Sequence, residues 1–457
     1  MLGGGPLATW TSSLVSIVFM CITAAVLREI CSALPISGSI YVWAMQAAGP
    51  RRARFVGCIV AWWITTTWIT FTASVSQFNA NYILSLVPVY DLEFPGGVSN
   101  DNVKWRAVVW FSSELLLLLA VLPNYLPPRM FSMVLRASVC VITLDFFLCI
   151  IWLPIGVSKT YGFRTAKEAF LTKFNGTGAP SGWNWMLSFV FASSLQAGFD
   201  AAGHVAEETK NASVVAAQSI FTSAVTSGIG GFIVTILFLF CTPDFDTLFS
   251  LNAPQPFVLI YTSALGRGGG TFMTVLAVVS ALLSNCIVVL AASRLIFSIA
   301  RDGTLPLSSW VSKVSHDGRP LNAVTLVYII GALLLCTILP STVAFFSLMS
   351  CSVLPLFSSY GVIALLRLVS TPNQFKTSKY SLGKFAKPLY IVTVLFHAVL
   401  FAVWTSPFTF PVSAKTLNFG PVIFGAVTIF GIMTWWFIPQ ETWLSKEKIE
   451  HAFEGAS

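Results

Sequence analysis

Long apolar runs separated by short polar stretches dominate this chain of 457 residues. A helix needs about 20 mainly apolar residues to cross the hydrocarbon core of a bilayer. Because the runs are long and lack strict alternation, they argue against a β-barrel and predict an all-α polytopic membrane protein. The eleven predicted spans are residues 9–31, 55–87, 105–123, 130–156, 183–206, 214–241, 271–300, 321–339, 343–367, 388–405 and 419–438.

Two further apolar segments, residues 36–50 and 254–266, are too short to cross a bilayer. Each suits an amphipathic or re-entrant piece at the membrane surface, and a plain loop is the alternative. The glycine-rich stretch 266–270 follows no strand, so we expect it to be an outer loop.

Composition narrows the class of protein further. Hydrophobic residues make up 56% of the chain and charged residues 10%, whereas soluble domains carry about 25% charged residues. This excludes a soluble enzyme, a disordered chain and a nucleic-acid-binding protein. The lipid bilayer is therefore an expected partner, and the net charge of +8 is typical of lysine and arginine collected in cytosolic loops.

The distribution of basic residues predicts the orientation. If the N-terminus lies outside, 18 of the 26 lysines and arginines fall in inner segments and eight in outer ones. The C-terminal tail is then cytosolic. The loop 157–182 carries four basic residues, which argues mildly against this orientation, but it also carries the glycosylation sequon Asn175-Gly176-Thr177, which fits an outer loop.

Catalytic and cofactor motifs are missing from the sequence. It contains no GxSxG, HExxH, Walker or dinucleotide-binding pattern, and its four histidines are scattered. We therefore predict no enzyme activity, no cofactor and no metal site.

The fifth predicted span carries the clearest candidate site. Its polar and glycine positions, Gln196, Gly198, Asp200, Gly203 and His204, lie near mid-depth. A charged side chain there costs on the order of 2.5–3.5 kcal/mol, so it usually faces a cavity or a partner. Glycines allow the helix to break, and a break frees backbone dipoles that bind an ammonium or a carboxylate. The alternative is a flexible helix whose Asp200 pairs with a neighbouring helix.

Polar residues in other spans are weaker candidates. Thr67 lies in a second span rich in hydroxyls and amides, and Asn285 lies in the seventh span. Such side chains either line a polar path or form hydrogen bonds between helices.

Four stretches resemble the amino acid–polyamine–organocation (APC) superfamily, most closely its fungal amino acid/GABA/choline-type permeases. The stretches are Gly3–Pro6, Arg28–Trp43, Gly198–Asn211 and Ala292–Pro306, and their order and spacing match over nearly the whole chain.

The resemblance implies an inverted-repeat fold of twelve spans, in which the broken first and sixth helices enclose the substrate. The first span here corresponds to the second helix of the family, so the first family helix would lie before Met1 and about eleven spans remain. The whole chain, 1–457, is then one permease domain. Its expected parts are the remainder of the first repeat (9–156), the second repeat (183–367), two C-terminal helices (388–438) and a cytosolic tail (439–457).

The resemblance also implies secondary transport of an amino acid or related, GABA-like amine by alternating access, coupled to protons. It implies that open carbonyls around Ala197, Gly198 and Asp200 hold the substrate ammonium and that Phe199 acts as a gate. With Gln196, Thr67 and Asn285, these are the predicted substrate-binding residues. The expected location is the plasma membrane, with the vacuolar membrane as the alternative. Without the first family helix, a truncated, non-transporting form or a nutrient sensor is the competing hypothesis, and a channel is a third.

Overall fold

The computed structural model describes residues 3–437 except 245–246, 249–252, 256, 304, 306, 341–342, 373–374, 376 and 414–415. The predicted tail, 439–457, lies outside the described residues. The described part is helical, apart from turns, loops and one isolated β-bridge between Gly3 and Asn175. The predicted all-α fold is confirmed.

Ten helices of the described chain are long and apolar enough to cross a membrane. They are α1 (Gly5–Ala33), α3 (Ala53–Leu84), α5 (Val103–Val121), α6 (Pro128–Lys159), α11 (Ala212–Cys241), α13 (Val258–Arg301), α15 (Leu321–Leu335), α16 (Ala344–Val369), α17 (Ala386–Thr405) and α18 (Gly420–Phe437). Each falls on one predicted span. The eleventh predicted span, 183–206, is divided among short helices. The other short helices include α2 (Ser39–Ala48), α4 (Leu86–Val89), α7 (Ala166–Leu171) and α14 (Ser308–Val311).

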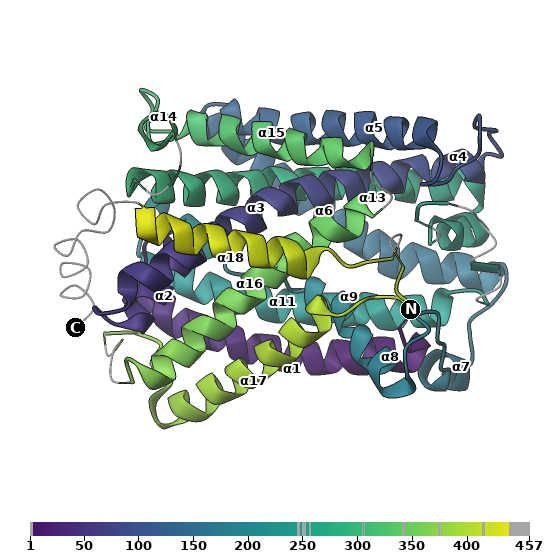
Figure 1. Cartoon of the computed structure of the whole chain (residues 1–457). Coiled ribbons are helices and arrows are strands. Elements are labelled where there is room, and N and C mark those ends of the chain that lie inside the picture. The colour runs from purple at the N-terminus through teal and green to yellow at the C-terminus, as the bar shows by residue number, and fades with distance from the viewer. Residues whose placement is uncertain are drawn as a thin grey trace.

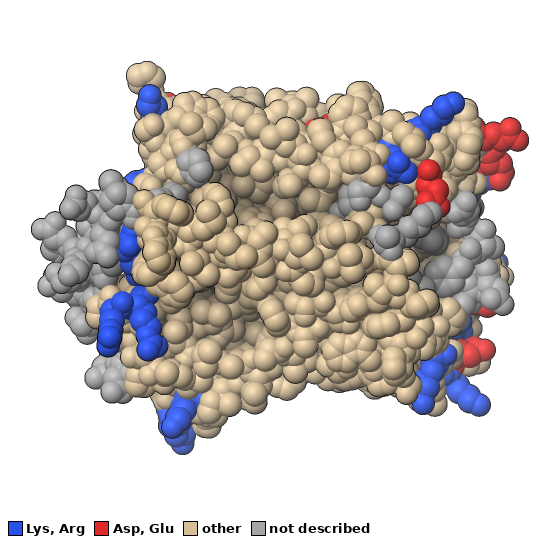
Figure 2. All heavy atoms as spheres, in the orientation of Figure 1, with Lys and Arg blue, Asp and Glu red and all other residues tan. Residues whose placement is uncertain are grey.

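The long helices lie side by side and run between two ends of the molecule (Figure 1). One end carries α2 and α14, and the other carries α4, α7 and the N-terminus. Figure 2 shows that charged side chains on this face gather mainly at these two ends, with a broad uncharged band between them. Because ionised side chains are costly in hydrocarbon, this band matches the interior of a bilayer. The protein is an integral, multi-pass membrane protein.

Helix α3 lies at the centre of the bundle and contacts α2, α5, α13, α15, α16 and α18. It has no face turned entirely to lipid, and 20 of its 32 residues are buried. Its polar side chains must therefore find partners within the protein. Asn285 of α13, for example, donates to Ser76 Oγ at 2.9 Å and to the Thr72 carbonyl at 3.2 Å.

Helices α1 and α11 pack closely through small residues. Ala217, Ala224 and Gly228 form a buried stripe on α11 at helical spacing. A Cβ atom added at Gly228 would lie 3.1 Å from Ile17 of α1. Small side chains allow this approach, which is a common way for membrane helices to associate without a hydrophobic driving force.

The segment 36–50 forms a short helix at one end of the molecule (Figure 1) and is not among the candidate spans, as predicted, but the interpretations as an amphipathic surface piece or a plain loop are wrong. All ten residues of α2 are buried, and α2 packs against α3 and α16. Its sequence is apolar nearly all round, as expected for a helix enclosed on every side. The Trp43 indole donates to the Leu34 carbonyl at 3.0 Å, so its polar edge also has a partner inside the protein.

The predicted outer loop at 266–270 is also wrong. Helix α13 runs through this stretch with a kink at Gly266, whose φ and ψ are 71° and 173°. The segment before the kink folds back onto the helix, since a Cβ at Gly270 would lie 2.8 Å from the Thr262 Cα. Gly266 therefore provides the kink and Gly270 the close backbone approach.

The sequon Asn175-Gly176-Thr177 forms a tight turn at the end that carries α7. The Asn175 amide nitrogen donates to the Ala179 carbonyl at 2.8 Å, and its oxygen accepts from the Gly178 N–H at 3.0 Å. Thr177 is buried and donates to Asn184 Oδ1 at 2.7 Å. The side chains of the sequon are thus part of the folded loop.

Replacing Gly156 with alanine tests the contact between α6 and α13. The new methyl group would lie 2.6 Å from the Ala264 carbonyl oxygen, and overpacking of this kind costs about 1–3 kcal/mol. We expect Gly156→Ala to lower the melting temperature of the detergent-purified protein by several degrees. Gly425→Ala is the control, because a Cβ there meets no atom within 4 Å. Equal melting temperatures for the two variants would contradict the close contact.

Candidate substrate site at a helix break

The segment 181–208 is interrupted between two short helical stretches. Helices α8 (Ser181–Leu187) and α9 (Phe189–Ser194) precede the break, and α10 (Ala201–His204) and the 3₁₀ turn η2 (Ala206–Glu208) follow it. Between them Gly198 has a φ of 90°, which a residue with a Cβ rarely adopts. Around the break, backbone N–H groups donate to the carbonyl three residues earlier, instead of four as in an α-helix. The Gln196 N–H, for example, donates to the Ser193 carbonyl at 3.1 Å. The sequence predicted this break.

The Asp200 side chain directly follows the break and is fully buried. Its Oδ1 accepts a hydrogen bond of 2.6 Å from the Tyr360 hydroxyl of α16. Its Oδ2 lies 3.1 Å from Nε2 of His204, within ion-pair distance but not aligned as a hydrogen bond. Both interpretations of the sequence are thus met in part, because the helix is broken and Asp200 also contacts a neighbouring helix.

His204 connects the break to α2. Its Nδ1 lies 2.7 Å from Oγ of Ser39, the first residue of α2, and both side chains are fully buried. The approach is close because Gly203 has no side chain, and a Cβ there would lie 2.9 Å from the Trp43 ring. The contact between Ser39 and His204 links α10 to α2, and the absence of a side chain at Gly203 allows the two helices to lie this close.

Aromatic rings lie next to Asp200 and its partners. Phe199 stacks on Tyr360 with ring centroids 5.4 Å apart, and the Trp68 ring of α3 lies perpendicular to the His204 ring with centroids 4.9 Å apart. Trp68 also faces the break, since a Cβ at Gly198 would lie 3.7 Å from it. A carboxylate among ring faces suits a cation, which the charge and the ring quadrupoles both attract. We call Asp200, His204, Trp68, Phe199 and Tyr360 the Asp200 cluster.

The structure brings only part of the predicted substrate-binding set together. Gly198, Phe199 and Asp200 lie at the break, with Ala197 half-buried beside them. Gln196 turns away, because its Oε1 lies near Gly228 of α11.

Thr67 and Asn285 belong to α3 and its contact with α13. Thr67 is buried and precedes Trp68 in the chain, and Asn285 forms hydrogen bonds between the two helices.

Sequence reasoning missed two members of the site. Tyr360 and Ser39 lie 160 and 165 residues from their partners, so neither is joined to the break by local spacing. His204 is one of the polar positions of the fifth predicted span but is not among the predicted substrate-binding residues, and neither is Trp68. A hydroxyl in an apolar span was the available signal for Tyr360.

Helix α3 carries several buried polar atoms that have no partner in the described part of the chain. Five of its buried residues have a side-chain nitrogen or oxygen with no hydrogen-bond partner among the described residues. They are Thr65, Thr67, Trp68, Gln77 and Asn79. Because native proteins leave few buried polar atoms unpaired, these groups, which lie on several sides of α3, are suited to contact water or a polar solute.

A groove of about 640 Å³ opens between α3, α15, α16 and α18. Its wall is mainly apolar, and the Asp200 cluster does not contribute to it. The polar and charged groups of the candidate site therefore lie at the helix break and not in this groove.

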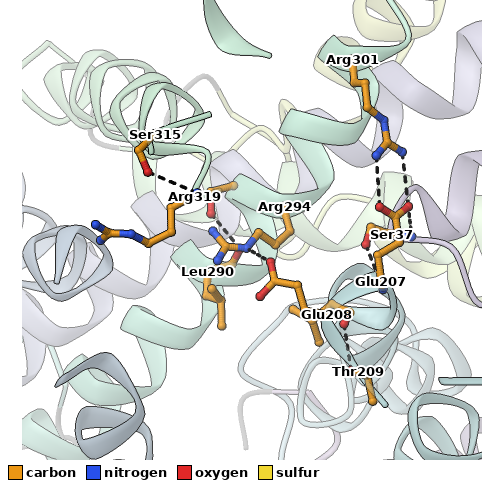
Figure 3. A network of polar contacts seen from close by, with 11 residues as sticks. Ser37, Glu207, Glu208, Thr209, Leu290, Arg294, Arg301, Ser315 and Arg319 are labelled. Atoms are coloured by element: carbon orange, nitrogen blue, oxygen red, sulfur yellow. Dashed lines mark hydrogen bonds and ion pairs between the residues drawn. The ribbon is translucent and has the colours of Figure 1, made fainter. Parts of the chain in front are cut away.

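Ion pairs fix the other side of the break at the end of the molecule that carries α2 (Figure 3). Arg301 of α13 donates to both Glu207 oxygens, at 3.1 and 3.3 Å, and the Ser37 N–H donates to Glu207 at 3.1 Å. Arg294 of α13 donates to Glu208 at 2.6 Å. These contacts, here called the charged latch, bind η2 to α13 and to the segment before α2.

The latch also sets the protonation of Glu207. Burial by itself would raise the pKa of this carboxyl, but the hydrogen bonds and charge of Arg301 and the Ser37 N–H outweigh it, so the pKa lies below its usual value. Glu207 is therefore ionised at neutral pH and available to hold Arg301.

Comparison with known proteins gives consistent relatives. Residues 1–436 match a family model described as amino acid permease. The thiamine transporter thi9 of Schizosaccharomyces pombe is 44% identical, over 97% of this chain and 79% of its own length. The amino-acid permease BAT1 of Arabidopsis thaliana is 26% identical, over 93% of this chain and 83% of its own.

A solved structure shares the fold. It is the crystal structure of the Eremococcus coleocola manganese transporter in complex with an aromatic bis-isothiourea substituted compound. It superposes with a TM-score of 0.51 at 12% identity, over 98% of this chain and 92% of that one. At this identity the similarity concerns the fold alone.

Replacing Gly198 with alanine tests the backbone of the break. A left-handed conformation costs a residue with a Cβ about 1–2 kcal/mol. We expect Gly198→Ala to lower the melting temperature, although the new methyl group would meet nothing closer than 3.7 Å. Gly230→Ala in α11 is the matched control, because its Cβ would also have its nearest neighbour at 3.7 Å but on helical backbone. If both variants melt alike, the unusual φ at Gly198 is refuted.

Replacing Glu207 with glutamine tests the latch. A carboxyl whose pKa is lower in the folded state stabilises the fold above its unfolded pKa of about 4.3, and this stability is lost as the pH falls through the folded value. We therefore expect Glu207→Gln to melt below wild type at neutral pH, with the difference shrinking in acid. Glu93→Gln, at an exposed position, should melt like wild type throughout. A pH-independent difference for Glu207→Gln would argue against the ion pair.

Proposed function

Because this chain belongs to the amino acid permease family of the APC superfamily, a family of membrane transporters, we propose that it is a secondary transporter of a small amine. The family prediction made from the sequence is confirmed at this level, and the GABA/choline subtype stays a prediction. The proposed substrates are amino acids or related amines. Thiamine is tested among the amines, because the relative of 44% identity is named a thiamine transporter.

The Asp200 carboxylate at the helix break carries this proposal. A buried carboxylate offers a charge for an ammonium or another organic cation, and the Trp68, Phe199 and Tyr360 rings offer aromatic surface around it. The expectation of open carbonyls at Gly198 and Asp200 is not met in this structure, because they accept from the Ala201 and Gly203 N–H groups at 3.1 and 2.8 Å. In this structure the cluster is closed, so a substrate reaches Asp200 only after neighbouring side chains move.

Alternating access gives the charged latch a role. The latch joins the far side of the break to α13, and opening it would let η2 and α10 move away from α2 and α13. We place this end at the cytosol, with a cytosolic C-terminus, a proton as the coupling ion and the plasma membrane as the location. The vacuolar membrane is the alternative.

Uptake by yeast that lacks its own thiamine and amino acid permeases tests the proposed transport. The full chain is expressed there, and uptake of radiolabelled thiamine, GABA and neutral amino acids is measured with and without a protonophore. We expect saturable uptake of at least one amine that the protonophore abolishes. Uptake of none of them, with the protein at the cell surface and binding retained, would support the sensor hypothesis instead.

Substitution of Asp200 tests whether this uptake depends on the candidate site at the helix break. Loss of a hydrogen bond to a charged group costs about 1.5–3 kcal/mol, and each 1.4 kcal/mol is about tenfold, so Asp200→Asn should reduce uptake at least about tenfold. Asp91→Asn is the matched control, because Asp91 is exposed at the opposite end. Wild-type uptake by Asp200→Asn at a normal surface level would remove Asp200 from the substrate site.

A further inference from the structure

A pocket of about 430 Å³ lies next to the charged latch, at the end of the molecule that carries α2. Its wall is formed by the 3₁₀ turn η1 (Leu122–Tyr125) and the segment that follows it, by the first turns of α6, by α13 and by the loop before α15. Glu208 of η2 completes the wall. The volume falls within the range of about 300–1,000 Å³ that is typical of small-molecule sites, and no residue of the Asp200 cluster lines the pocket.

The pocket has an apolar side and a charged side. Four side chains form the apolar side: Leu126, Phe131, Leu135 and Leu290. The charged side consists of two ion pairs, which are Arg294–Glu208 at 2.6 Å and Arg319–Asp317 at 2.9 Å. Since the two positive and the two negative charges balance, the pocket suits a ligand that carries both signs of charge and an apolar group.

The Arg294–Glu208 pair has unused hydrogen-bonding capacity. A guanidinium has five N–H donors and a carboxylate has two acceptor oxygens. In the described part of the chain, Arg294 donates to Glu208 through Nε and Glu208 accepts through Oε1, with no further hydrogen-bond partner for either side chain (Figure 3). Arg319 differs, because its terminal nitrogens donate to Asp317 and to two carbonyls of the segment after η1. The free donors and the free acceptor of the pocket therefore lie together on the latch.

Asn124 of η1 adds an acceptor to the pocket. It is 7% exposed, and its Nδ2 donates to the Ala120 and Cys286 carbonyls at 3.3 and 3.2 Å. These hydrogen bonds fix the orientation of the amide and leave Oδ1 buried, with no partner among the described residues. Because buried polar atoms are rarely left unpaired, this oxygen indicates a bound donor, such as an ammonium or a water molecule.

We propose that this pocket binds an amino acid with an apolar side chain, and that the bound amino acid holds the charged latch closed. The ligand carboxylate accepts from the terminal nitrogens of Arg294, and the ligand ammonium donates to Oε2 of Glu208. The ligand side chain lies against the apolar side of the pocket. Pairing of a carboxylate with an arginine is among the stronger hydrogen-bonding arrangements in proteins.

The position of the site explains its effect on the latch. Arg294 belongs to α13 and Glu208 to η2, so the two halves of the site are together only while the latch is closed. A ligand that binds one state and not the other stabilises the state that it binds. Because we place this end at the cytosol, an amino acid there would slow the release of the broken segment from α13. Binding itself does not depend on the proposed transport.

Binding of radiolabelled leucine to the full-length protein in lipid nanodiscs gives the first test. The Asp200→Asn variant serves as the parent, so that the proposed substrate site at the helix break does not contribute. We expect saturable binding by this parent, and binding weaker by at least about tenfold after Arg294→Gln is added. Arg129→Gln is the matched control, because Arg129 is exposed at the start of α6 and does not line the pocket. It should bind leucine like the parent.

Two analogues of leucine test the need for both charges. Isocaproate lacks the ammonium and isoamylamine lacks the carboxylate, so each should compete at least about tenfold less well than leucine itself. In Glu208→Gln the advantage of leucine over isocaproate should disappear, because the neutral amide no longer attracts the ammonium. A general loss of structure would weaken both compounds alike and would not produce this change. An advantage that survives in Glu208→Gln would refute the ammonium contact.

Hydrogen exchange of η2 tests the effect on the latch. The Glu208 and Thr209 N–H groups donate to the Val205 and Ala206 carbonyls at 3.1 and 3.0 Å, so their exchange reports whether this turn is intact. Saturating leucine should slow this exchange in the Asp200→Asn parent and leave it unchanged after Arg294→Gln is added. Leucine that binds without slowing the exchange would refute the closed latch as the state that the ligand selects.

The remaining outcomes separate this pocket from the proposed substrate site. Leucine binding that is present in wild type and lost in Asp200→Asn would assign the ligand to the Asp200 cluster and overturn the proposal. Equal competition by isocaproate and leucine would mean a site for a simple anion, which also overturns it. Failure of the uptake test, with leucine bound at the pocket, would contradict the transport function alone and support the pocket as a separate site.

Discussion

Moving a carboxylate out of water costs several kcal/mol even after the protein relaxes, and only good pairing and hydrogen bonding repay it. Asp200 meets this requirement inside the bundle through three parts of the chain: Tyr360 of α16, His204 of α10 and, through His204, Ser39 of α2. These contacts bring α2 and α16 to the break. The arrangement of the site follows largely from the need to satisfy one charge in a place without water.

The break and the central helix have complementary roles. Gly198 interrupts the helical hydrogen bonding two residues before Asp200, and α3 presents the Trp68 ring to this position. Since α3 is enclosed by six other helices, it gives a fixed wall, and the short helix α10 lies against α2, α11 and α13. The latch at Glu207 and Glu208 binds the far side of the break to α13.

The sequence was sufficient for features that depend on local length and composition. Ten spans and the break at Gly198 follow from apolar runs and from glycine beside a mid-membrane acid. Prediction from the sequence failed where contacts with other parts of the chain determine the local structure. Whether 36–50 lies at a surface or inside the protein depends on α3 and α16 covering it, and glycines at 266–270 resemble a loop until the approach to Thr262 is seen. The roles of Tyr360 and Ser39 at the site were not predicted for the same reason, because their partners are distant in the chain.

The turn at Asn175 has a consequence for how the topology can be tested. Oligosaccharide transfer forms a bond to the asparagine amide nitrogen, and that nitrogen is engaged with the Ala179 carbonyl, while the Thr177 hydroxyl is buried against Asn184. In the finished loop Asn175 is exposed but its amide nitrogen is hydrogen-bonded, and Thr177 is buried, so we expect a sugar to be attached before the loop has closed. A mature protein without a glycan would then report rapid closure of this loop, and would be no evidence that the loop faces the cytosol.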